Sequence, residues 1–276
     1  MVSSAHNSRE EAPLEAPVNT PDALVTRDGP IMTLTFNRPQ TRNAMTWAMY
    51  ERLLQVCEEV DADDSVRVLV LRGAGGKAFV AGTDISQFKV FETAEDGLAY
   101  ERDGAARSAR LERVKKPVIA QVQGFAVGGG FGITACCDIR IATPDAKFGA
   151  PIARTLGNCL SMETYARFVD LLGTSIVKDV IFRARFLTAQ EALAAGFVHE
   201  IVAPEEIDAR VKAIALEIAD HAPITIQVTK ESLRRIRDHR GLPDGDDLIA
   251  RTYTSADFRE GAAAFIEKRK PRWTGK

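Results

Sequence analysis

The spacing of apolar residues changes along the chain. Up to about residue 150, short β-favouring runs alternate with segments whose apolar residues recur at helical spacing. From Ser161 onward, nearly every segment has the helical spacing. This order predicts an α/β core with an appended helical region, all within one continuous fold.

The β-favouring runs predict one hairpin and several buried strands. Residues 23–26 and 31–36 flank the turn sequence Asp28-Gly29-Pro30, as the two arms of a hairpin would. Continuous apolar runs predict buried strands at 66–73 and 117–124. Two shorter strands are expected in "IRIAT" and "AKFGAP".

The helical segments begin with one that Thr46 is expected to cap, "WAMYERLLQVCEEVDAD". A helix with many charges is predicted at 98–113, and an apolar helix after the glycines near residue 130. Further helices are predicted at 163–172, 175–182, 188–195, 205–219, 224–239 and 255–268.

The amino-acid composition limits the kinds of molecule that the protein is expected to bind. Hydrophobic residues make up 45% of the 276 residues, charged residues 27%, and the formal net charge is -2, as in an ordinary globular protein. Because nucleic-acid-binding proteins usually carry a basic excess, we predict no nucleic-acid partner. The four cysteines show no C-x-x-C spacing, and we interpret them as reduced thiols of a cytoplasmic protein.

The first twenty residues are rich in Ser, Glu, Ala and Pro and lack the apolar segment of a signal peptide. We predict a disordered tail over 1–20, a core over 21–203 and a helical region over 204–276. No run of apolar residues is long enough to span a bilayer, so no membrane association is expected.

Several catalytic and cofactor motifs do not fit the sequence. The glycine cluster puts Ile133 where a dinucleotide fingerprint needs its third glycine, and "RGAGGKAF" lacks two residues of a phosphate loop. The four histidines show no metal-binding spacing, so we predict no metal site. A G-x-S-x-G nucleophile motif is absent.

Three consecutive glycines, Gly128 to Gly130, interrupt the apolar segment "QGFAVGGGFGITACCD". A glycine turn between a strand and a helix leaves N–H groups at the helix N-terminus, where they favour developing negative charge. The turn therefore has the outline of an oxyanion site. The alternative role is close packing of the helix on the strand.

The glycine segment and "KAFVAGTDISQF" together resemble the crotonase superfamily, also called the enoyl-CoA hydratase/isomerase family. The resemblance extends to "FNRPQTRNAMT", "CCDIRIATPDAKFGAP", "FLTAQEALAAGFVHEIV" and "FREGAAAFIEKRKPRW". It implies an α/β fold, a crotonase-like spiral of ββα repeats with a C-terminal helical trimerisation region. A homotrimer or homohexamer is the implied assembly.

The resemblance also implies site residues. Two backbone amides, those of Ala81 and Gly129, would hold the thioester oxygen of an acyl-CoA substrate as it becomes an enolate. Coenzyme A would enter as part of the substrate, with no separate cofactor. The residues implied to bind it are Arg42, Thr83, Asp84, Ile85, Phe265 and Lys268. Asp84 has a second interpretation as a helix cap.

The sequence departs from the hydratases of this family at two positions. These enzymes use two glutamates, and the resemblance places Gly132 and Ile152 there. Neither side chain can carry a proton, and each acid–base group usually contributes about 10²–10⁴-fold to the rate. We therefore expect a reaction other than two-glutamate hydration.

Other polar residues could supply the missing proton transfer. The isomerase-type acid position falls on Ser161, and Glu163 follows two residues later. Glu163 is a candidate acid/base, although a carboxylate in the first turn of a helix also stabilises the helix dipole. The remaining candidates are Glu92, Arg154, Asn158, Cys159, Tyr165 and Tyr253.

Three functions are compatible with these features. The first is an acyl-CoA enzyme that stabilises an enolate and performs isomerisation, decarboxylation or thioester hydrolysis. The second is a non-catalytic acyl-CoA binding protein, suggested by the residues at 132 and 152. The third is an enzyme acting on a carbonyl compound without CoA.

Overall fold

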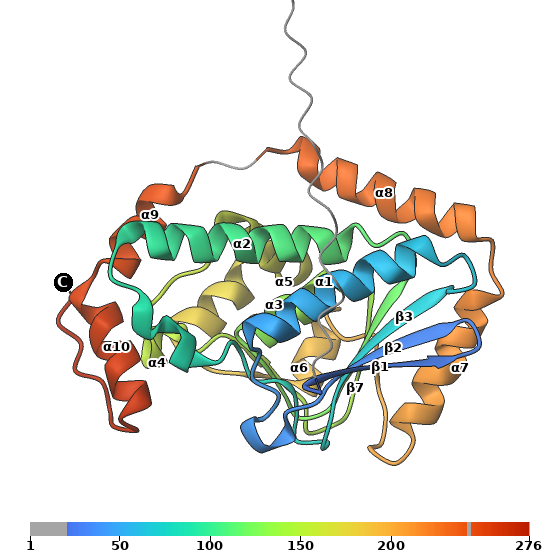
Figure 1. The fold of residues 1–276 in the computed structure, drawn as a ribbon, viewed down its shortest axis with the longest axis horizontal. Helices are drawn as coiled ribbons and strands as arrows, with labels where there is room; N and C mark the ends of the chain where they lie inside the picture. Colours follow the sequence, from blue (N-terminus) through green and yellow to red (C-terminus); the bar gives the residue numbers. More distant parts are fainter. Residues whose placement is uncertain (1–20, 242–243, 276) are drawn as a thin grey trace, which may run out of the picture.

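A six-stranded sheet forms one side of the core in this computed structural model, which describes residues 21–241 and 244–275 (Figure 1). Its strands lie in the order β1-β2-β3-β5-β7-β10. The first pair is antiparallel and the remaining pairs are parallel. The strands are β1 (Ala23–Asp28), β2 (Ile31–Phe36), β3 (Val68–Gly73), β5 (Val118–Val122), β7 (Ile139–Ala142) and β10 (Glu200–Ile201).

A second, four-stranded sheet has the order β4-β6-β8-β9. Its strands are β4 (Ala78–Val80), β6 (Phe125–Val127), β8 (Lys147–Gly149) and β9 (Leu187–Thr188). Successive strand pairs β3–β4, β5–β6 and β7–β8 each give one strand to each sheet, and a helix follows each pair. The chain therefore advances in ββα repeats, as predicted.

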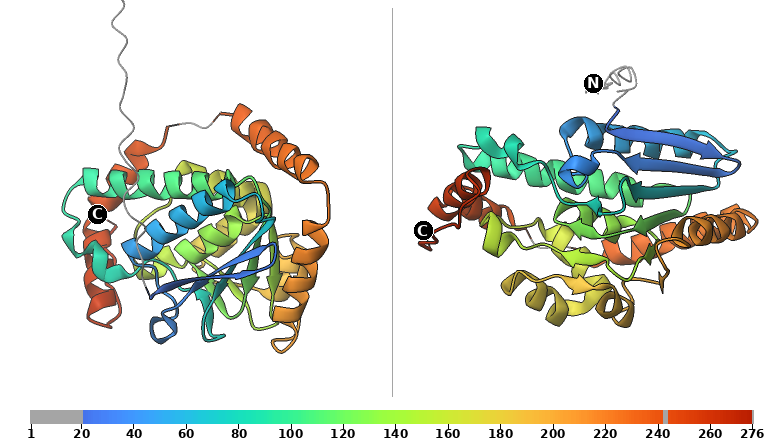
Figure 2. Two further views of the ribbon diagram at one scale, coloured as in Figure 1. Left: turned by 45° about the vertical axis from the view of Figure 1, so that its right-hand side comes forward. Right: turned by 90° about the horizontal axis from the view of Figure 1, so that it is seen from below.

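The helices surround the sheets and extend past them at the C-terminal end (Figures 1 and 2). They are α1 (Trp47–Ala62), α2 (Ala94–Glu112), α3 (Gly129–Cys136), α4 (Ile152–Thr155), α5 (Met162–Phe182), α6 (Ala189–Ala194), α7 (Ile207–Ala219), α8 (Pro223–His239), α9 (Asp246–Tyr253) and α10 (Ala256–Ile266). Two short 3-10 helices, η1 (Pro39–Thr41) and η2 (Ile85–Val90), complete the described structure.

Strand β3 shows why the central strands of the six-stranded sheet are continuous apolar runs in the sequence. Leu69 and Leu71 pack in the main core with α1, whereas Val68 and Val70 pack on the other face against α7. Successive side chains of a strand point to opposite faces, so a sheet covered on both faces needs apolar residues at every position. The central strands are therefore buried on both sides.

The early element predictions are confirmed, and several boundaries differ. The hairpin forms as predicted, and the Thr46 side chain accepts a bond from the Met49 amide as the cap of α1. Helix α2 begins four residues earlier than predicted, because Thr93 and Asp96 form a capping box. The tail predicted over 1–20 lies outside the described residues.

Some elements gave no clear sequence signal. Strands β4 and β6 have three residues each, too few for a period of two to be visible. Strand β8 is as short but lies within the predicted "AKFGAP". Helix α9 was not predicted. The helices predicted at 163–172 and 175–182 are the two halves of α5, which is interrupted at Gly173, where φ is 75°.

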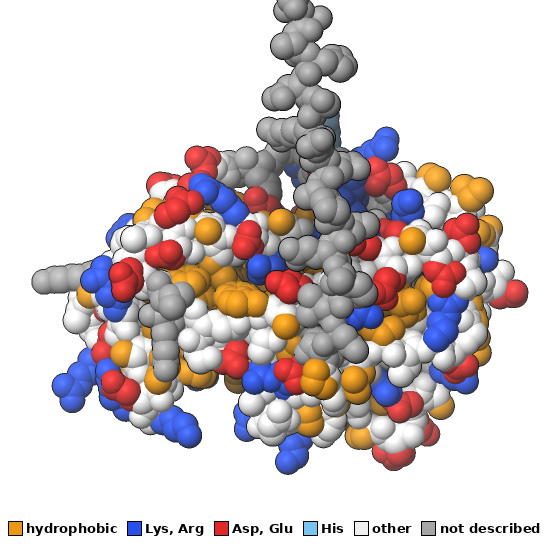
Figure 3. Space-filling model, viewed as in Figure 1, with side chains coloured by type: hydrophobic (Ala, Val, Ile, Leu, Met, Phe, Trp, Pro, Cys, Tyr) orange, Lys and Arg blue, Asp and Glu red, His pale blue; other side chains and the backbone are white. Residues whose placement is uncertain are grey.

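The last helices return to the core and cover one end of it. Helix α9 packs along α2, and α10 packs against η2 and α4. Apolar side chains gather in a hollow below α2 in the space-filling view (Figure 3). The C-terminal segment thus lies beside the loops that follow β4 and β8.

Candidate active site

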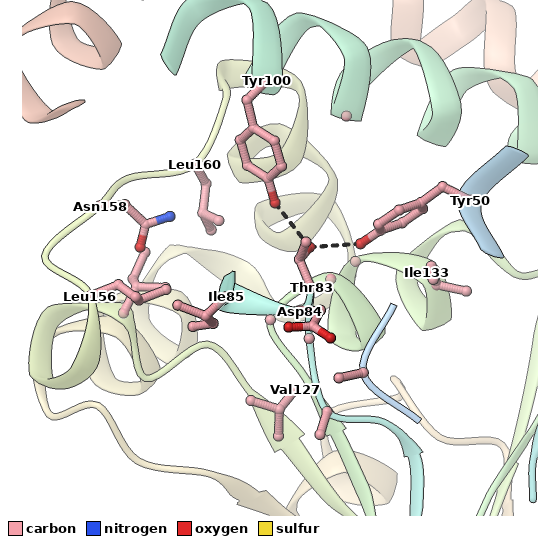
Figure 4. A pocket seen from close by; sticks show the side chains of 18 of the residues that line it. Tyr50, Thr83, Asp84, Ile85, Tyr100, Val127, Ile133, Leu156, Asn158 and Leu160 are labelled. Carbon is pink, nitrogen blue, oxygen red and sulfur yellow. Dashed lines mark hydrogen bonds between the residues drawn. The ribbon is translucent and has the colours of Figure 1, made fainter. Parts of the chain in front are cut away.

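A cavity of about 520 Å³ lies between α2, the start of α3 and the segment that follows β4 (Figure 4). Residues 81–85, the glycine turn and several side chains of α2 line it, together with Phe265 of α10. Its lining is mostly apolar, with a few polar groups that converge from different elements. Pockets of this kind are typical of small-molecule sites.

The glycines of the turn serve both of the roles that the sequence left open. Gly128 has a φ of 54°, which favours glycine. A Cβ at Gly130 would lie 2.1 Å from the Val80 carbonyl oxygen, so this glycine permits α3 to pack on β4. A Cβ at Gly129 would instead lie 2.6 Å from the Tyr50 hydroxyl, in the cavity lining.

Two backbone N–H groups face the cavity and donate no hydrogen bond to another described residue. Gly129 is the first residue of α3, where N–H groups have no intrahelical partner. Thr83 forms a parallel bridge in which Met45 donates to Gly82 and accepts from Asp84, so the Thr83 amide is not used. That amide lies 3.7 Å from the position of a Gly129 Cβ. Within the described residues, neither amide donates a hydrogen bond.

The structure corrects the expected role of Ala81. Its amide donates to the Arg42 carbonyl at 3.1 Å and so is not available to a ligand. Gly82, with a φ of 103°, turns the chain between Ala81 and Thr83. Because this turn could not be located in the sequence, the expected donor was placed two residues too early.

Three hydroxyl groups form a chain beside the two amides. The Thr83 Oγ1 atom lies 2.9 Å from the Tyr50 Oη atom and 3.0 Å from the Tyr100 Oη atom (Figure 4). Burial raises the pKa of both tyrosines. Both phenols therefore stay protonated at neutral pH and can donate hydrogen bonds.

Glu101 is a buried carboxylate that sequence reasoning missed. It projects from α2 into the cavity lining and is 7% exposed. Its Oε1 accepts a bond from the Tyr253 hydroxyl at 2.8 Å, and its Oε2 accepts one from the Ser161 amide at 2.9 Å. Burial, with a smaller contribution from the charge of Glu163, raises the pKa of Glu101 to about 7.

One sequence signal could have revealed Glu101. Spacings of three and four residues along α2 connect the positions that face inward, namely Gly97, Glu101, Gly104, Ser108 and Leu111. A single carboxylate on such a stripe of small and apolar residues is unusual, because isolated charges are rarely buried. The many charges of α2 concealed the stripe.

Comparison with known proteins shows the family of the chain. The sequence profile of the family described as "Enoyl-CoA hydratase/isomerase" matches residues 26–276. The chain belongs to the enoyl-CoA hydratase/isomerase family. A short-chain-enoyl-CoA hydratase from Clostridium acetobutylicum is 35% identical over 90% of this chain and 96% of its own length. A carnitinyl-CoA dehydratase from Salmonella arizonae is 34% identical over 91% of this chain and 97% of its own length.

A solved structure of methylmalonyl-CoA decarboxylase complexed with 2S-carboxypropyl-CoA has the same fold. It superimposes with a TM-score of 0.85 at 28% identity, covering 94% of this chain and 100% of the other. The crotonase-like fold inferred from the motifs is thereby confirmed. Relatives with hydratase, dehydratase and decarboxylase names all match nearly the whole chain.

The residues that the family resemblance assigned to CoA fall into two groups. Arg42 and residues 83–85 line the cavity, with the Arg42 guanidinium 5.4 Å from the centre of the Phe125 ring. Phe265 also lines it, and comes from the same chain. Lys268 follows α10, is exposed and is not part of the lining.

Asp84 has the structural role that the sequence left open. Its side chain caps η2 by accepting from the Ser86 amide at 3.2 Å, and it pairs with Arg38 at 3.1 Å. Although burial opposes ionisation, these partners hold the pKa of Asp84 below its usual value. The carboxylate therefore stays charged and tied to the chain.

Glu163 does not line the candidate site. It lines a separate hollow with Glu112, Arg167 and Arg237, and it occupies the first turn of α5. The structure therefore favours its role at the helix terminus over the catalytic role. The catalytic expectation for Glu163 is corrected by this placement.

The other polar candidates have mixed outcomes. Burial raises the pKa of Cys159 to about 11, so its thiol is a poor nucleophile at neutral pH. The Ser161 side chain caps α5. Asn158 lines the cavity, and Tyr253 reaches its edge through Glu101. Residues that do not line it are Glu92, Arg154 and Tyr165.

Among the described residues, no group of three or more His, Cys, Asp or Glu side chains is placed to hold a metal ion. Over the same part of the chain, no helix has the length and apolar character needed to cross a membrane.

Proposed function

We propose that the protein binds an acyl-CoA thioester and stabilises its enolate with the amides of Thr83 and Gly129. The observation that carries this proposal is the convergence of two unpaired backbone amides on one cavity. A thioester oxygen between them would receive hydrogen bonds as it gains negative charge. One such donor is typically worth about 10²–10³-fold in rate.

The proposed reaction is isomerisation, decarboxylation or thioester hydrolysis rather than two-glutamate hydration. Gly132 and Ile152 both line the cavity, so neither position supplies a proton-carrying group. A Cβ at Gly132 would meet no atom within 4 Å, which leaves this part of the cavity open to substrate. Isomerisation and decarboxylation pass through the enolate, whereas thioester hydrolysis passes through a tetrahedral oxyanion that the same two amides would hold.

We assign the CoA part of the substrate to the mouth of the cavity, with no additional cofactor. Arg42 would pair with phosphate groups, and the backbone of residues 83–85 would contact the adenine. Phe265 would pack against the CoA chain. Lys268 is exposed outside the cavity, so we propose for it only a contact with the part of CoA that remains outside.

A mass-spectrometric screen tests this proposal. Purified protein is incubated with crotonyl-CoA, 3-enoyl-CoA, malonyl-CoA and aromatic acyl-CoA thioesters, with a Gly129→Val variant in parallel. Conversion of one thioester that is lost in the variant is the expected result. Conversion that survives at the wild-type rate in a folded variant would contradict the role of the two amides.

The second candidate function is a non-catalytic acyl-CoA binding protein. It is favoured by the residues at Gly132 and Ile152 and by the intact cavity. Tight binding of CoA thioesters without conversion across the whole panel would support it. An enzyme acting without CoA would instead show no affinity for any of these thioesters.

We further propose that the chain assembles as a homotrimer or homohexamer. Helix α8 presents large apolar side chains to solvent, and a partner subunit would remove them from water. These side chains are Ile224, Val228, Leu233 and Ile236. Sedimentation equilibrium on the full chain measures the assembly, and a monomer at micromolar concentration would contradict it.

A further inference from the structure

We propose that Glu101 is the proton-transfer residue of this cavity, which removes the α-proton of the bound acyl thioester and returns a proton to the enolate. This inference rests on the proposed enolate chemistry at Thr83 and Gly129. It assigns to Glu101 the acid–base role for which the sequence had suggested Glu163.

The first argument is elimination among the groups that line the cavity. In the part of the chain that the structure describes, the lining carboxylates are Asp84 and Glu101. Asp84 is held by Arg38 and by the η2 amide. Arg107 also lines the cavity, but its guanidinium lies over the rings of Trp47 and Tyr50. Glu101 has no ion-pair partner in the described structure.

The second argument is the hydrogen bonding of the carboxylate. Each oxygen of Glu101 accepts one bond, from Tyr253 or from the Ser161 amide. Because a carboxylate oxygen can accept two, each retains a lone pair for a proton. The two bonds fix the orientation of the group on α2 and leave its reactivity intact.

The third argument is a buried hydrogen-bond acceptor close to Glu101 that receives no hydrogen bond from the described residues. Asn158 donates to the Tyr253 hydroxyl at 3.4 Å, and its Oδ1 atom is buried without a partner among the described residues. Buried acceptors are nearly always satisfied in native proteins. The Asn158 oxygen therefore points to a donor on a bound molecule in the cavity that both Asn158 and Glu101 line.

The proposed step is balanced within the bound substrate. The Glu101 carboxylate forms an O–H bond with the α-proton, and the C–H electrons form a C=C bond. The carbonyl π electrons move to the thioester oxygen, which the two amides hold. The same O–H then delivers its proton to carbon and restores the thioester. A pKa near 7 suits both directions, because each form of Glu101 is populated at neutral pH.

Hydrogen exchange tests this step without knowledge of the natural substrate. Butyryl-CoA has α-hydrogens, no double bond and no carboxylate to lose. It is incubated with the protein in D₂O, and deuterium in the acyl chain is measured by mass spectrometry. We expect wild-type exchange, a loss of about 10²–10⁴-fold in Glu101→Gln, and a much smaller change in the matched control Glu163→Gln, which removes only the minor contribution of the Glu163 charge to the pKa of Glu101.

The pH profile separates a catalytic group from a structural one. Exchange should rise with pH to a plateau, with a midpoint near 7, because the base form of Glu101 is required. Since the Tyr253 hydroxyl stabilises the carboxylate, Tyr253→Phe should move this midpoint to higher pH. The other ionisable groups that interact with Glu101 are Tyr50, Tyr100, Cys159, Glu163 and Tyr165.

The outcomes distinguish failure of this inference from failure of the proposed function. Butyryl-CoA affinity is measured by calorimetry for each variant. Exchange that is unchanged in folded Glu101→Gln would overturn the role of Glu101 alone. Binding without exchange in the wild type would also overturn it and would support the binding-protein alternative. Absence of both binding and exchange would overturn the acyl-CoA proposal itself.

Discussion

Two parts of the cavity lining, which we name the amide end and the carboxyl end, are built from different materials. The amide end consists of the backbone amides of Thr83 and Gly129, held in place by strands, a bridge and a helix N-terminus. The carboxyl end is the Glu101 side chain of the same lining, held by Tyr253, which lies 152 residues away in sequence. The amide end belongs to the repeating core, and the carboxyl end depends on the last helices.

This difference indicates which part of the site can change between related proteins. A substitution rarely removes a backbone amide, so the amide end persists as long as its glycines are kept. The carboxyl end depends on one side chain and can arise on any element that lines the cavity. Relatives named for different reactions are consistent with this division.

Beyond the loss expected in Glu101→Gln, the largest expected effect comes from filling the amide end. In Gly129→Ala the new Cβ would lie 2.6 Å from the Tyr50 hydroxyl and would crowd the thioester position. We expect butyryl-CoA exchange to fall by about 10²–10³-fold. Because Tyr50→Phe removes the crowding atom, the double variant should recover part of the loss. A double variant no faster than Gly129→Ala would show that the Tyr50 contact is not the cause.

The next effect concerns the carboxyl end and stability. A carboxylate whose pKa rises from 4.5 to about 7 on folding binds more protons when folded, so stability falls as pH rises through this window. Glu101→Gln should remove this loss, which amounts to about 3 kcal/mol above pH 7. Chemical denaturation of both proteins between pH 5 and pH 8 measures it. Parallel pH curves would contradict the buried state of Glu101.

A smaller effect is expected inside the glycine turn. In Gly130→Ala, the Cβ meets the Val80 carbonyl, so α3 must move away from β4 at a cost of about 1–3 kcal/mol. Gly132→Ala is the matched control, because no atom lies within 4 Å of its Cβ. For Gly132→Ala we expect the free energy of unfolding to rise by about 0.5–1 kcal/mol, because alanine favours a helix more than glycine does. Urea denaturation compares them, and equal stabilities would argue against close packing at Gly130.

The smallest predicted effect is on CoA recognition. Arg42→Met keeps an apolar chain near Phe125 and removes the charge that we assign to phosphate. KM for a CoA thioester should rise about tenfold with kcat unchanged, which corresponds to about 1.4 kcal/mol. The acyl-pantetheine thioester, which lacks the phosphates, serves as the control. A similar rise with that substrate would mean that Arg42 acts through the fold.

The sequence predicted the fold and the amide end better than the carboxyl end, for a physical reason. Glycines at a strand-to-helix turn are a local requirement of the backbone, so the turn could be recognised from neighbouring residues, and the family resemblance then assigned the donor to Gly129. The donor at Thr83 was missed by two positions, because the Gly82 turn that redirects the amides depends on the bridge to Met45. Glu101 was missed because its burial depends on contacts with Ser161 and Tyr253, which only the folded chain brings together.

The bond between Tyr253 and Glu101 also has a consequence for synthesis on the ribosome. Both amide donors and Glu101 itself emerge within the first half of the chain, whereas Tyr253 is among the last residues to be translated. Until it emerges, the carboxyl lacks its hydroxyl donor and α2 lacks its contact with α9. In the mechanism that we propose, a nascent chain would carry both amide donors before it carries the group that orients Glu101, so proton transfer would begin only after the last residues have folded.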